Sequence, residues 1–341
     1  MKIARLYSFT DIRIEEMPVP GIGPGDALMR TRACGICSGD VMPWYIEKKA
    51  PLVLGHEPSG ELVAVGGNVQ GFVPGDRVFV HHHAPCTACR CCLRGDHVQC
   101  ETWRDSKIVP GGVAEYVLIP EINLRHDTLK LPPSVSFEDG CLVEPAACVI
   151  KSLKRSGIRK GDTVLVIGLG VMGQMHVLLA REFGAGCIIG ADMIGYRLGK
   201  AREFGADGTI NVAEADLKMR VAELTGGRMA DIVIVGPNSA DAMRQGMDVV
   251  AAGGTVVLFT PAKPGEMIAV DPNSLYFRDI SLVTSYSCGP DDTAAALEHI
   301  QKGTITAGKL VTHRFSIDRT AEAYRLTAEA GESLKSLILF P

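Results

Sequence analysis

The chain has 341 residues, enough for two domains with their own cores, and its formal net charge of −4 provides no basic footprint for nucleic acid. No apolar stretch is long enough to span a bilayer, and the first residues lack the apolar core of a signal peptide. The 11 cysteines, without a secretory signal, indicate reduced thiols or metal ligands and hence the cytoplasm.

The first part of the chain, to about Leu142, has short and partly alternating apolar runs separated by proline and glycine, which predict a small barrel or folded sheet. The strands expected there span residues 12–16, 27–33, 60–65, 77–80 and 114–118. After about Glu144 the pattern alternates between β runs and helical spacing, which predicts a six-stranded parallel sheet. Its predicted strands span residues 163–167, 187–191, 208–211, 231–235, 255–259 and 280–285, and its helices include 197–204 and 240–250. The tail beyond about Tyr286 predicts a helix over 291–302, a strand over 312–317 and a final helix, and it returns to the first domain.

A candidate catalytic metal site involves the segment CGICSGD. Cys34 and Cys37 have the spacing of a zinc pair, but Cys34 belongs to the apolar alternation of a strand and is interpreted as a core residue. Cys37 follows the strand end, where a turn can present a thiolate. His56 and Glu57 lie in a turn bracketed by glycine and proline, and Glu144 precedes the second domain. Cysteine, histidine and carboxylate with one open position is the composition of a catalytic zinc site, although each residue alone is equally compatible with a structural role.

A second cluster of cysteines lies in the compact loop 85–101. Cys86, Cys89, Cys92 and Cys100 predict a closed tetrahedral structural zinc site, for which an iron–sulfur cluster is the chemical alternative. Cys91 is left without a role. The preceding run of histidines, residues 81–83, follows a strand, so that its side chains alternate in direction and are interpreted as loop or pocket-edge residues.

The stretch VLVIGLGVMGQMHVLLAREFGAGCIIGAD reads as strand, glycine-rich turn, helix, strand and acid, the pattern of a dinucleotide-binding unit. Gly168 allows the tight turn, Gly170 lets a pyrophosphate approach the backbone at the helix N-terminus, and Gly173 lets the helix lie close to the strand. A carboxylate at Asp192 can bind the adenosine ribose hydroxyls and repels a 2′-phosphate, which favours NAD over NADP. Arg197, shortly after it, could instead pair with that phosphate.

Taken together, these motifs resemble the zinc-containing medium-chain dehydrogenases, and most of all the sorbitol (polyol) dehydrogenases and threonine 3-dehydrogenases. The resemblance extends over nearly the whole chain and includes GHEPSGELVAVGGNVQGFVPGDRV, GGVAEYVLIP, LVEPAACVI, GLGVMG and ADMIGYRLGKAREFGAD. It implies an α/β chain with a GroES-like, β-rich catalytic domain over residues 1–147 and 287–341, interrupted by a doubly wound Rossmann domain over 148–286. It places the active site in the cleft between the two domains.

The resemblance also implies roles for individual residues. Cys37, His56 and one or both of Glu57 and Glu144 would hold the catalytic zinc. The residues that would contact the nicotinamide half of the cofactor or line its pocket are Met172, Thr260, Ser285 and Tyr286. A homodimer or homotetramer is expected by the same analogy.

The turn after Cys37 departs from the family pattern. Family members usually have serine or threonine two places beyond the cysteine, where its hydroxyl helps to move the alcohol proton, and a histidine shortly after. This chain has Gly39 and Met42 at those positions, so the proton would pass through Ser38, Glu144 or a water chain.

These features predict a zinc- and NAD-dependent oxidoreductase that acts on a polyol, cyclitol or other secondary alcohol. The alternatives are an amino-alcohol oxidation like that of threonine 3-dehydrogenase, a zinc-free quinone or enoyl reductase of the same superfamily, and a non-catalytic NAD-binding or redox-sensing protein.

Overall fold

The computed structural model describes residues 1–341, and its internal contacts divide the chain into two compact units. Unit 1 contains Met1–Ala147 and Cys288–Pro341, and unit 2 contains Cys148–Ser287. Helix α6 (Val143–Ser156) begins in unit 1 and ends in unit 2. None of the helices combines the length and the apolar character that crossing a membrane requires.

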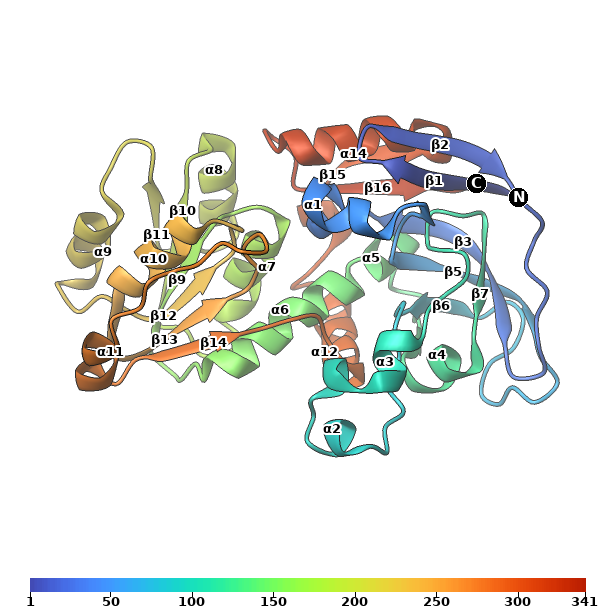
Figure 1. Cartoon of the computed structure of the whole chain (residues 1–341), viewed down its shortest axis with the longest axis horizontal. Coiled ribbons are helices and arrows are strands. Elements are labelled where there is room, and N and C mark those ends of the chain that lie inside the picture. Colours follow the sequence, from blue (N-terminus) through green and yellow to red (C-terminus); the bar gives the residue numbers. More distant parts are fainter. The chain divides into compact units, whose positions relative to one another are not determined.

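Unit 1 is organised around two β-sheets (Figure 1). The larger sheet has the order β15-β16-β3-β5-β6-β8, with β7 paired to β3, and all its pairs are antiparallel except β15 with β16. The smaller sheet has the order β2-β1-β4. The strands of unit 1 are β1 (Lys2–Ser8), β2 (Asp11–Glu16), β3 (Ala27–Gly35), β4 (Leu52–Val53), β5 (Glu57–Val65), β6 (Arg77–Val80), β7 (Tyr116–Ile119), β8 (Thr128–Lys130), β15 (Val311–Ser316) and β16 (Lys335–Leu339).

The helices of unit 1 are mostly single turns between these strands. Two apolar clusters form its core, one around Leu54, Tyr324 and Ile338 and the other around Met29, Leu62 and Val78. The helices are α1 (Pro43–Ile46), α2 (Arg90–Leu93), α3 (Glu101–Asp105), α4 (Glu121–His126), α5 (Phe137–Gly140), α12 (Pro290–Gln301), α13 (Ala307–Leu310) and α14 (Thr320–Glu329), with 3-10 turns η1 (Ser38–Val41), η2 (Glu47–Lys49), η3 (His97–Gln99) and η4 (Ile317–Arg319).

Unit 2 contains the predicted six-stranded sheet, and every pair in it is parallel. The strand order β11-β10-β9-β12-β13-β14 reverses direction beside β9, as in a doubly wound dinucleotide-binding fold, so the predicted fold class is confirmed. The strands are β9 (Thr163–Ile167), β10 (Cys187–Asp192), β11 (Gly208–Asn211), β12 (Ala230–Val235), β13 (Val250–Leu258) and β14 (Ser281–Thr284).

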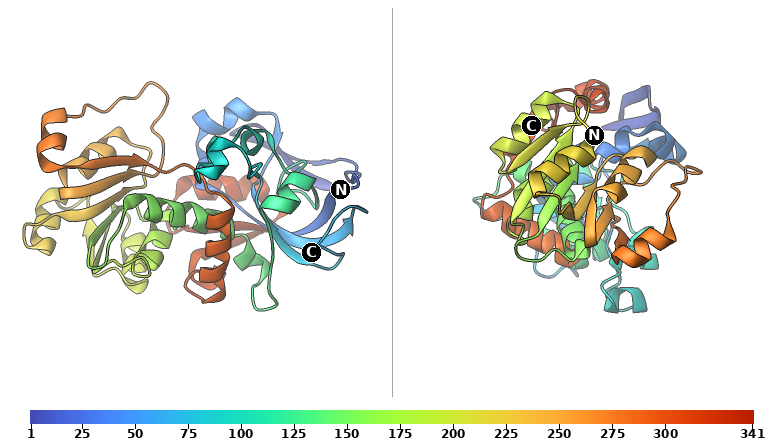
Figure 2. Two further views of the ribbon diagram at one scale, coloured as in Figure 1. Left: turned by 90° about the horizontal axis from the view of Figure 1, so that it is seen from below. Right: turned by 90° about the vertical axis from the view of Figure 1, so that its left-hand side faces the viewer.

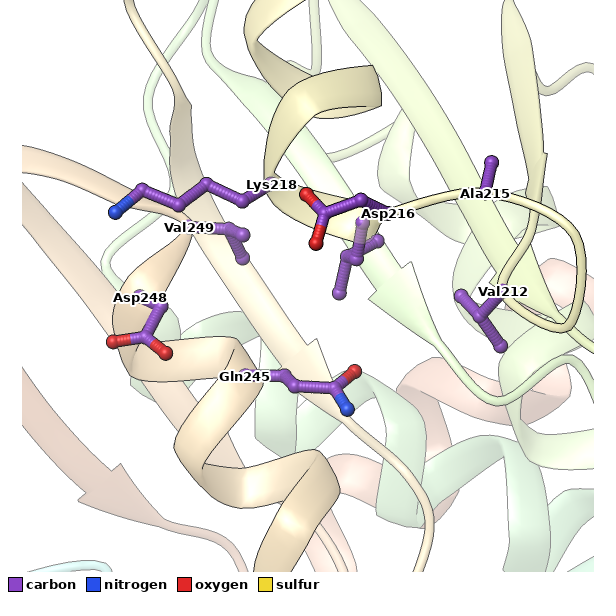
Figure 3. Close-up of a pocket in the computed structure, with 8 residues that line it drawn as sticks. Val212, Ala215, Asp216, Lys218, Gln245, Asp248 and Val249 are labelled. Carbon is purple, nitrogen blue, oxygen red and sulfur yellow. The ribbon is translucent and has the colours of Figure 1, made fainter.

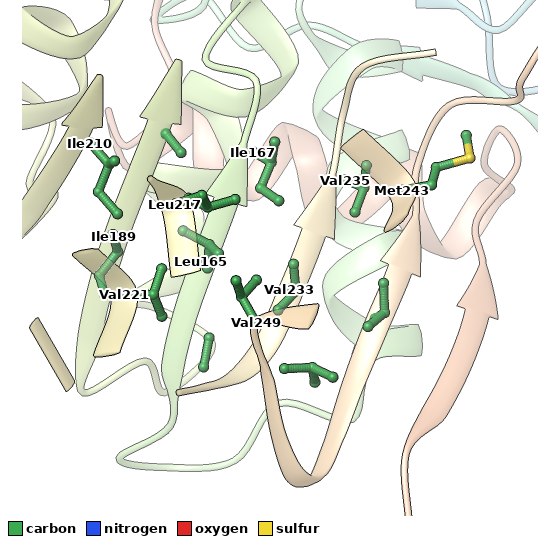
Figure 4. Close-up of a cluster of buried hydrophobic side chains, with 14 residues drawn as sticks. Leu165, Ile167, Ile189, Ile210, Leu217, Val221, Val233, Val235, Met243 and Val249 are labelled. Carbon is green, nitrogen blue, oxygen red and sulfur yellow. The ribbon is translucent and has the colours of Figure 1, made fainter. Parts of the chain in front are cut away.

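Helices cover both faces of this sheet (Figure 2). On one face, Val164, Val166 and Ile188 pack against α7 (Val171–Ala180) and α8 (Gly195–Glu203). On the other, apolar side chains of the same strands pack against α9 (Leu217–Thr225) and α10 (Ala240–Asp248) (Figure 4). Burial on both faces explains why all five residues of β9 are buried, and why these strands are continuous apolar runs in the sequence. The remaining helix is α11 (Pro272–Arg278).

The structure corrects the prediction at the C-terminus. The predicted final helix exists as α14, but the chain does not end with it, because β16 follows and joins β3 in the large sheet. The element boundaries also shift: β3 continues to Gly35, and β13 begins at Val250, where the sequence predicts the end of a helix.

One buried histidine in unit 2 connects α7, the helix that follows the glycine-rich turn, to α6. His176 Nδ1 lies 2.8 Å from the carbonyl oxygen of Met172, and its Nε2 lies 2.6 Å from Ser152 Oγ. Burial lowers the pKa of His176 to about 4, against the opposing effect of the Met172 carbonyl. The folded protein therefore keeps a neutral imidazole at a pH where the unfolded chain takes up a proton.

We therefore predict that His176 makes the fold acid-sensitive. Its contribution to the free energy of unfolding is complete above the unfolded pKa of about 6.5 and falls by about 1.4 kcal/mol for each pH unit below it, on the order of 3 kcal/mol by pH 4. Urea unfolding between pH 7.5 and 5 measures this loss, and His176→Asn is expected to show a shallower pH dependence than the wild type. An identical pH dependence in both proteins would contradict the assignment.

Candidate active site

The register of β3 against β5 brings two predicted site segments together in unit 1. Gly35, the last residue of β3, is paired with Glu57, the first residue of β5. Cys37 follows β3 by two residues, and His56 directly precedes β5. Because the strands are antiparallel, the end of one and the start of the other meet at the same edge of the sheet.

The turn after β3 is shaped by the cysteine itself. Cys37 is the N-cap of η1, and its Sγ accepts a hydrogen bond from the backbone N–H of Gly39 at 3.3 Å. This hydrogen bond fixes the position of the sulfur at the start of the turn. Cys34, one turn of chain earlier, is fully buried in the core, in agreement with its interpretation from the sequence.

A thiol, an imidazole and a carboxylate converge at this edge. Potential ligand atoms of Cys37, His56 and Glu57 all lie within 4.8 Å of one another. Behind them, Asp40 Oδ2 lies 3.0 Å from His56 Nδ1 and is almost completely buried. This contact fixes the ring orientation and leaves Nε2 for a metal ion, the usual arrangement behind a ligating histidine. Burial disfavours a charge on His56, but Asp40 and Cys37 outweigh it and raise the pKa of His56 well above its usual value.

A buried ion pair holds Glu57 in place. The ammonium of Lys335, in β16, contacts the carboxylate of Glu57, and both side chains are 1% exposed. Lys335 also donates a hydrogen bond to the carbonyl oxygen of Ile36 at 2.9 Å. A side chain at Gly35 would collide with this pair, because a Cβ there would lie 1.9 Å from Glu57 Oε2 and 2.9 Å from Lys335 Cε. Sequence reasoning missed Lys335, which belongs to β16, a strand that the sequence pattern did not predict.

The second predicted carboxylate, Glu144, lies near the start of α6 and is 5% exposed. Its carboxylate is within 4.8 Å of nitrogen atoms of both His81 and His82. The rings of His82 and His56 are 4.8 Å apart between centroids, so the two groups of potential ligands adjoin. The side chain of Ser38, the candidate proton carrier, is exposed on η1.

The four predicted cysteines of the loop lobe form a compact group. The sulfur–sulfur distances are 3.5 Å for Cys89 and Cys92, 3.6 Å for Cys100 and Cys86, and 3.9 Å for Cys86 and Cys92. Tetrahedral zinc with Zn–S bonds of about 2.3 Å requires sulfur atoms about 3.8 Å apart, so this arrangement fits a closed zinc site. Cys91 lies outside the group.

In unit 2 the glycine-rich turn has the backbone that the motif predicts. Gly168 has a φ of +86°, a left-handed conformation that favours glycine. A Cβ on Gly173 would lie 2.0 Å from the Gly168 carbonyl oxygen, so only glycine lets α7 approach β9 here. A Cβ on Gly170 would meet nothing closer than Arg197 at 3.8 Å, which leaves space above the N-terminus of α7 for a phosphate group.

Asp192, at the end of β10, is 7% exposed and is held by this turn. Its Oδ2 accepts a hydrogen bond from the N–H of Leu169 at 2.7 Å, and its Oδ1 accepts one from Ile194 at 2.9 Å. Each carboxylate oxygen retains a further lone pair for a ribose hydroxyl. Arg197 Nη1 lies 3.8 Å from Oδ2, so the guanidinium is close to the same position.

The other residues assigned to the nicotinamide side differ in environment. Ser285, which follows β14, is 6% exposed and its Oγ has no hydrogen-bond partner in the protein. Tyr286 is 57% exposed, whereas Met172 and Thr260 are half-buried. A buried hydroxyl without a protein partner can hydrogen-bond to a ligand at this edge of the sheet.

A surface hollow in unit 2 lies between α9 and α10 (Figure 3). Asp216, Lys218, Gln245 and Asp248 are among its lining residues, and none of the glycines of the turn takes part. Asp216 is already engaged as the N-cap of α9, where it accepts a hydrogen bond from Met219. This hollow is therefore separate from the predicted cofactor residues.

The metal-ligand set of unit 1 and the dinucleotide turn of unit 2 define a metal-dependent, nucleotide-linked oxidoreductase. A family model for the alcohol dehydrogenase GroES-like domain matches residues 23–133, and one for zinc-binding dehydrogenases matches residues 171–302. A sorbitol dehydrogenase of Halalkalibacterium halodurans is 33% identical over 333 residues, which cover 95% of this chain and 94% of that protein. The chain belongs to the zinc-binding alcohol dehydrogenase family, and it is a zinc-dependent oxidoreductase of the polyol and alcohol class.

Solved structures of the family agree with this fold. A zinc-binding dehydrogenase of Sinorhizobium meliloti 1021 bound to NADP superposes with a TM-score of 0.89 at 28% identity, with 99% of each chain covered. A short chain alcohol dehydrogenase of Escherichia coli CFT073 complexed with NADH gives a TM-score of 0.89 at 26% identity, and the match covers 100% of this chain and 99% of that one.

The lobe geometry leads to a prediction with a matched control. Cys100→Ser removes one thiolate from the group of four and is expected to reduce the zinc content by about one ion per chain and to lower the thermal midpoint. Cys91→Ser removes a neighbouring cysteine outside the group and should keep the full zinc content. Elemental analysis of the purified proteins measures both. Equal zinc losses in the two variants would contradict the assignment.

Proposed function

We propose that the protein oxidises a secondary alcohol of the polyol class with NAD, at a zinc ion held by Cys37, His56 and Glu144. The single observation that supports this most strongly is the convergence of Cys37 and His56 with Asp40 behind the histidine. A thiolate and an oriented imidazole, together with a carboxylate from Glu57 in the same group or from Glu144 in the adjoining one and with one position left for a substrate oxygen, fit a catalytic zinc ion.

The choice of Glu144 over Glu57 rests on electrostatics. The buried ammonium of Lys335 already pairs with Glu57, and removing that partner would leave a buried lysine charge uncompensated. Because Glu57 is already engaged by Lys335, the carboxylate that we assign to the metal is that of Glu144. Glu57 would then stay paired with Lys335, and its carboxylate would compensate the ammonium charge beside the metal.

When bound, zinc supplies a Lewis acid that lowers the pKa of an alcohol hydroxyl, and nicotinamide supplies the hydride acceptor. The chain's own residues position both. Asp40 holds the His56 ring, the N–H of Gly39 orients the Cys37 sulfur, and the N-terminus of α7 receives the pyrophosphate. With Gly39 and Met42 in place of the usual relay residues, the alcohol proton leaves through water, Glu144 or the exposed Ser38.

Asp192 supports a preference for NAD. Its carboxylate is fixed by two backbone N–H groups and is 7% exposed, so it cannot turn away from a 2′-phosphate without losing both hydrogen bonds. Arg197 Nη1 lies 3.8 Å from this carboxylate, so its charge reduces the repulsion between Asp192 and a 2′-phosphate.

We further propose a homo-oligomer that uses the outer edge of the sheet in unit 2. Strand β14 ends the strand order and pairs only with β13, which leaves its other edge unpaired. Nearby on α11, Tyr276 and Phe277 are 79% and 78% exposed. An unpaired strand edge beside exposed aromatic rings supports association with a second copy.

The experiment that tests the function is an alcohol panel with NAD, read by the absorbance of NADH, on protein of measured zinc content. We expect oxidation of sorbitol or a related polyol. Cys37→Ala should lower kcat/KM by at least about 1,000-fold, because the metal loses a ligand, while NAD binding measured by fluorescence stays nearly intact. Full activity of Cys37→Ala would refute the proposed site.

A second experiment tests the cofactor preference. Asp192→Gly removes the carboxylate that binds the ribose and repels a 2′-phosphate, so KM for NAD should rise by about 10-fold or more and the NAD/NADP ratio of kcat/KM should fall. Asp207→Gly, an acidic residue outside the turn, is the control and should leave the ratio unchanged. The same ratio in Asp192→Gly and wild type would remove the argument for NAD.

A further inference from the structure

The run of three histidines after β6 has no part in the proposed mechanism, yet it lies against the metal site. The ring of His82 packs on that of His56, with a centroid distance of 4.8 Å and an angle of 48° between the rings. The carboxylate of Glu144 is also within 4.8 Å of a His82 nitrogen. His82 therefore borders two residues that we assign to the zinc ion.

The two neighbouring histidines hold His82 in this position. His81 is fully buried, and its Nδ1 lies 2.6 Å from Asp127 Oδ2, while Thr293 Oγ1 donates to the other oxygen of Asp127 at 2.6 Å. His83 Nδ1 lies 2.5 Å from the Ser106 carbonyl oxygen.

Ring packing adds to these polar contacts. The His83 ring lies 4.2 Å from that of His82 and 4.3 Å from that of Trp103, between centroids. The chain on each side of His82 is thus fixed, and its ring is enclosed between those of His56 and His83.

His82 itself has no hydrogen-bond partner in the protein. Its Nδ1 is buried and unpaired, and no protein group bonds to Nε2 either. The residue as a whole is only partly buried. A neutral imidazole offers one donor and one acceptor, and a hydroxyl group satisfies either of them.

The residues around Cys37 offer few other polar side chains that could bind a substrate hydroxyl, apart from the imidazole of His82. Gly39 carries no side chain and Met42 offers no strong hydrogen-bonding group. Asp40 is engaged by His56, and Lys335 is engaged by Glu57 and Ile36. His82 is the polar side chain beside His56 whose ring nitrogens remain free of protein partners.

We propose that His82 binds the hydroxyl next to the reacting one and thereby selects vicinal diols and polyols over simple secondary alcohols. A metal held by His56 would bind the reacting oxygen, and the ring of His82 packs directly on that of His56. In a vicinal diol, the oxygen on the adjacent carbon lies about one hydrogen-bond length from the reacting oxygen. This second hydroxyl is the group that we assign to the His82 imidazole. This inference rests on the proposed function and names the substrate class of the same site.

The test compares 2,3-butanediol with 2-butanol, which differ by the second hydroxyl. In His82→Phe the diol/mono-alcohol ratio of kcat/KM should fall by about 10- to 100-fold, the usual effect of losing one hydrogen bond to a bound substrate. The loss should fall mainly on KM for the diol, because the non-reacting hydroxyl is bound equally in the ground and transition states. His82→Gln, which keeps a hydrogen-bonding group, should recover part of the ratio and replaces His82→Phe if that variant does not fold. His126→Phe, which removes an imidazole on α4 outside this cluster, is the control and should keep the wild-type ratio.

A binding measurement without turnover completes the test. In cobalt-substituted protein with NADH, titration with 2,3-butanediol should perturb the visible cobalt bands, with an apparent Kd about 10-fold or more weaker in His82→Phe. If no alcohol is oxidised by the wild type, the proposed function fails. If alcohols are oxidised but the ratio is the same in His82→Phe, or if that variant loses the catalytic metal, the role of His82 as a substrate contact is overturned while the proposed function stands.

Discussion

The pairing of Gly35 with Glu57 is the constraint on which the candidate active site depends. A shift of β3 against β5 by one residue would turn every side chain to the opposite face and would separate Cys37 from His56. The absence of a side chain at residue 35 makes room for the buried contact between Glu57 and Lys335. The same glycine thus leaves room for the ion pair beside the candidate metal site.

The ion pair links the end of the chain to this site. Lys335 comes from β16, which lies beside β3 and pairs Leu337 with Gly35. Burying two charges is costly unless each is compensated, so the pair contributes more to a unique arrangement than to the free energy of unfolding. The aspartate at position 40 has a comparable role for His56. The candidate metal ligands are therefore surrounded by groups that fix charge and orientation, contributed by segments far apart in the sequence.

Local patterns predicted the fold of unit 2 and the identity of most candidate residues. The run Val164–Ile167 followed by Gly168 predicts β9 and its turn, because a parallel strand buried on both faces is continuously apolar and only glycine adopts the turn's backbone. Lys335 and the contact of His82 with His56 could not be predicted, because they depend on tertiary pairing between distant segments. The apolar run SLILF at the C-terminus was the available indication of β16. The alternation argument interpreted the three histidines as loop or pocket-edge residues and could not identify the neighbour of His82.

The most direct test of the account is the position of zinc in crystals of the active protein, measured by anomalous scattering on the two sides of the zinc absorption edge. The account predicts two peaks per chain. One lies among Cys86, Cys89, Cys92 and Cys100, and the other is bonded to Cys37, His56 and Glu144 while Glu57 keeps its contact with Lys335. A fully active crystal with no anomalous peak beside Cys37 would contradict it.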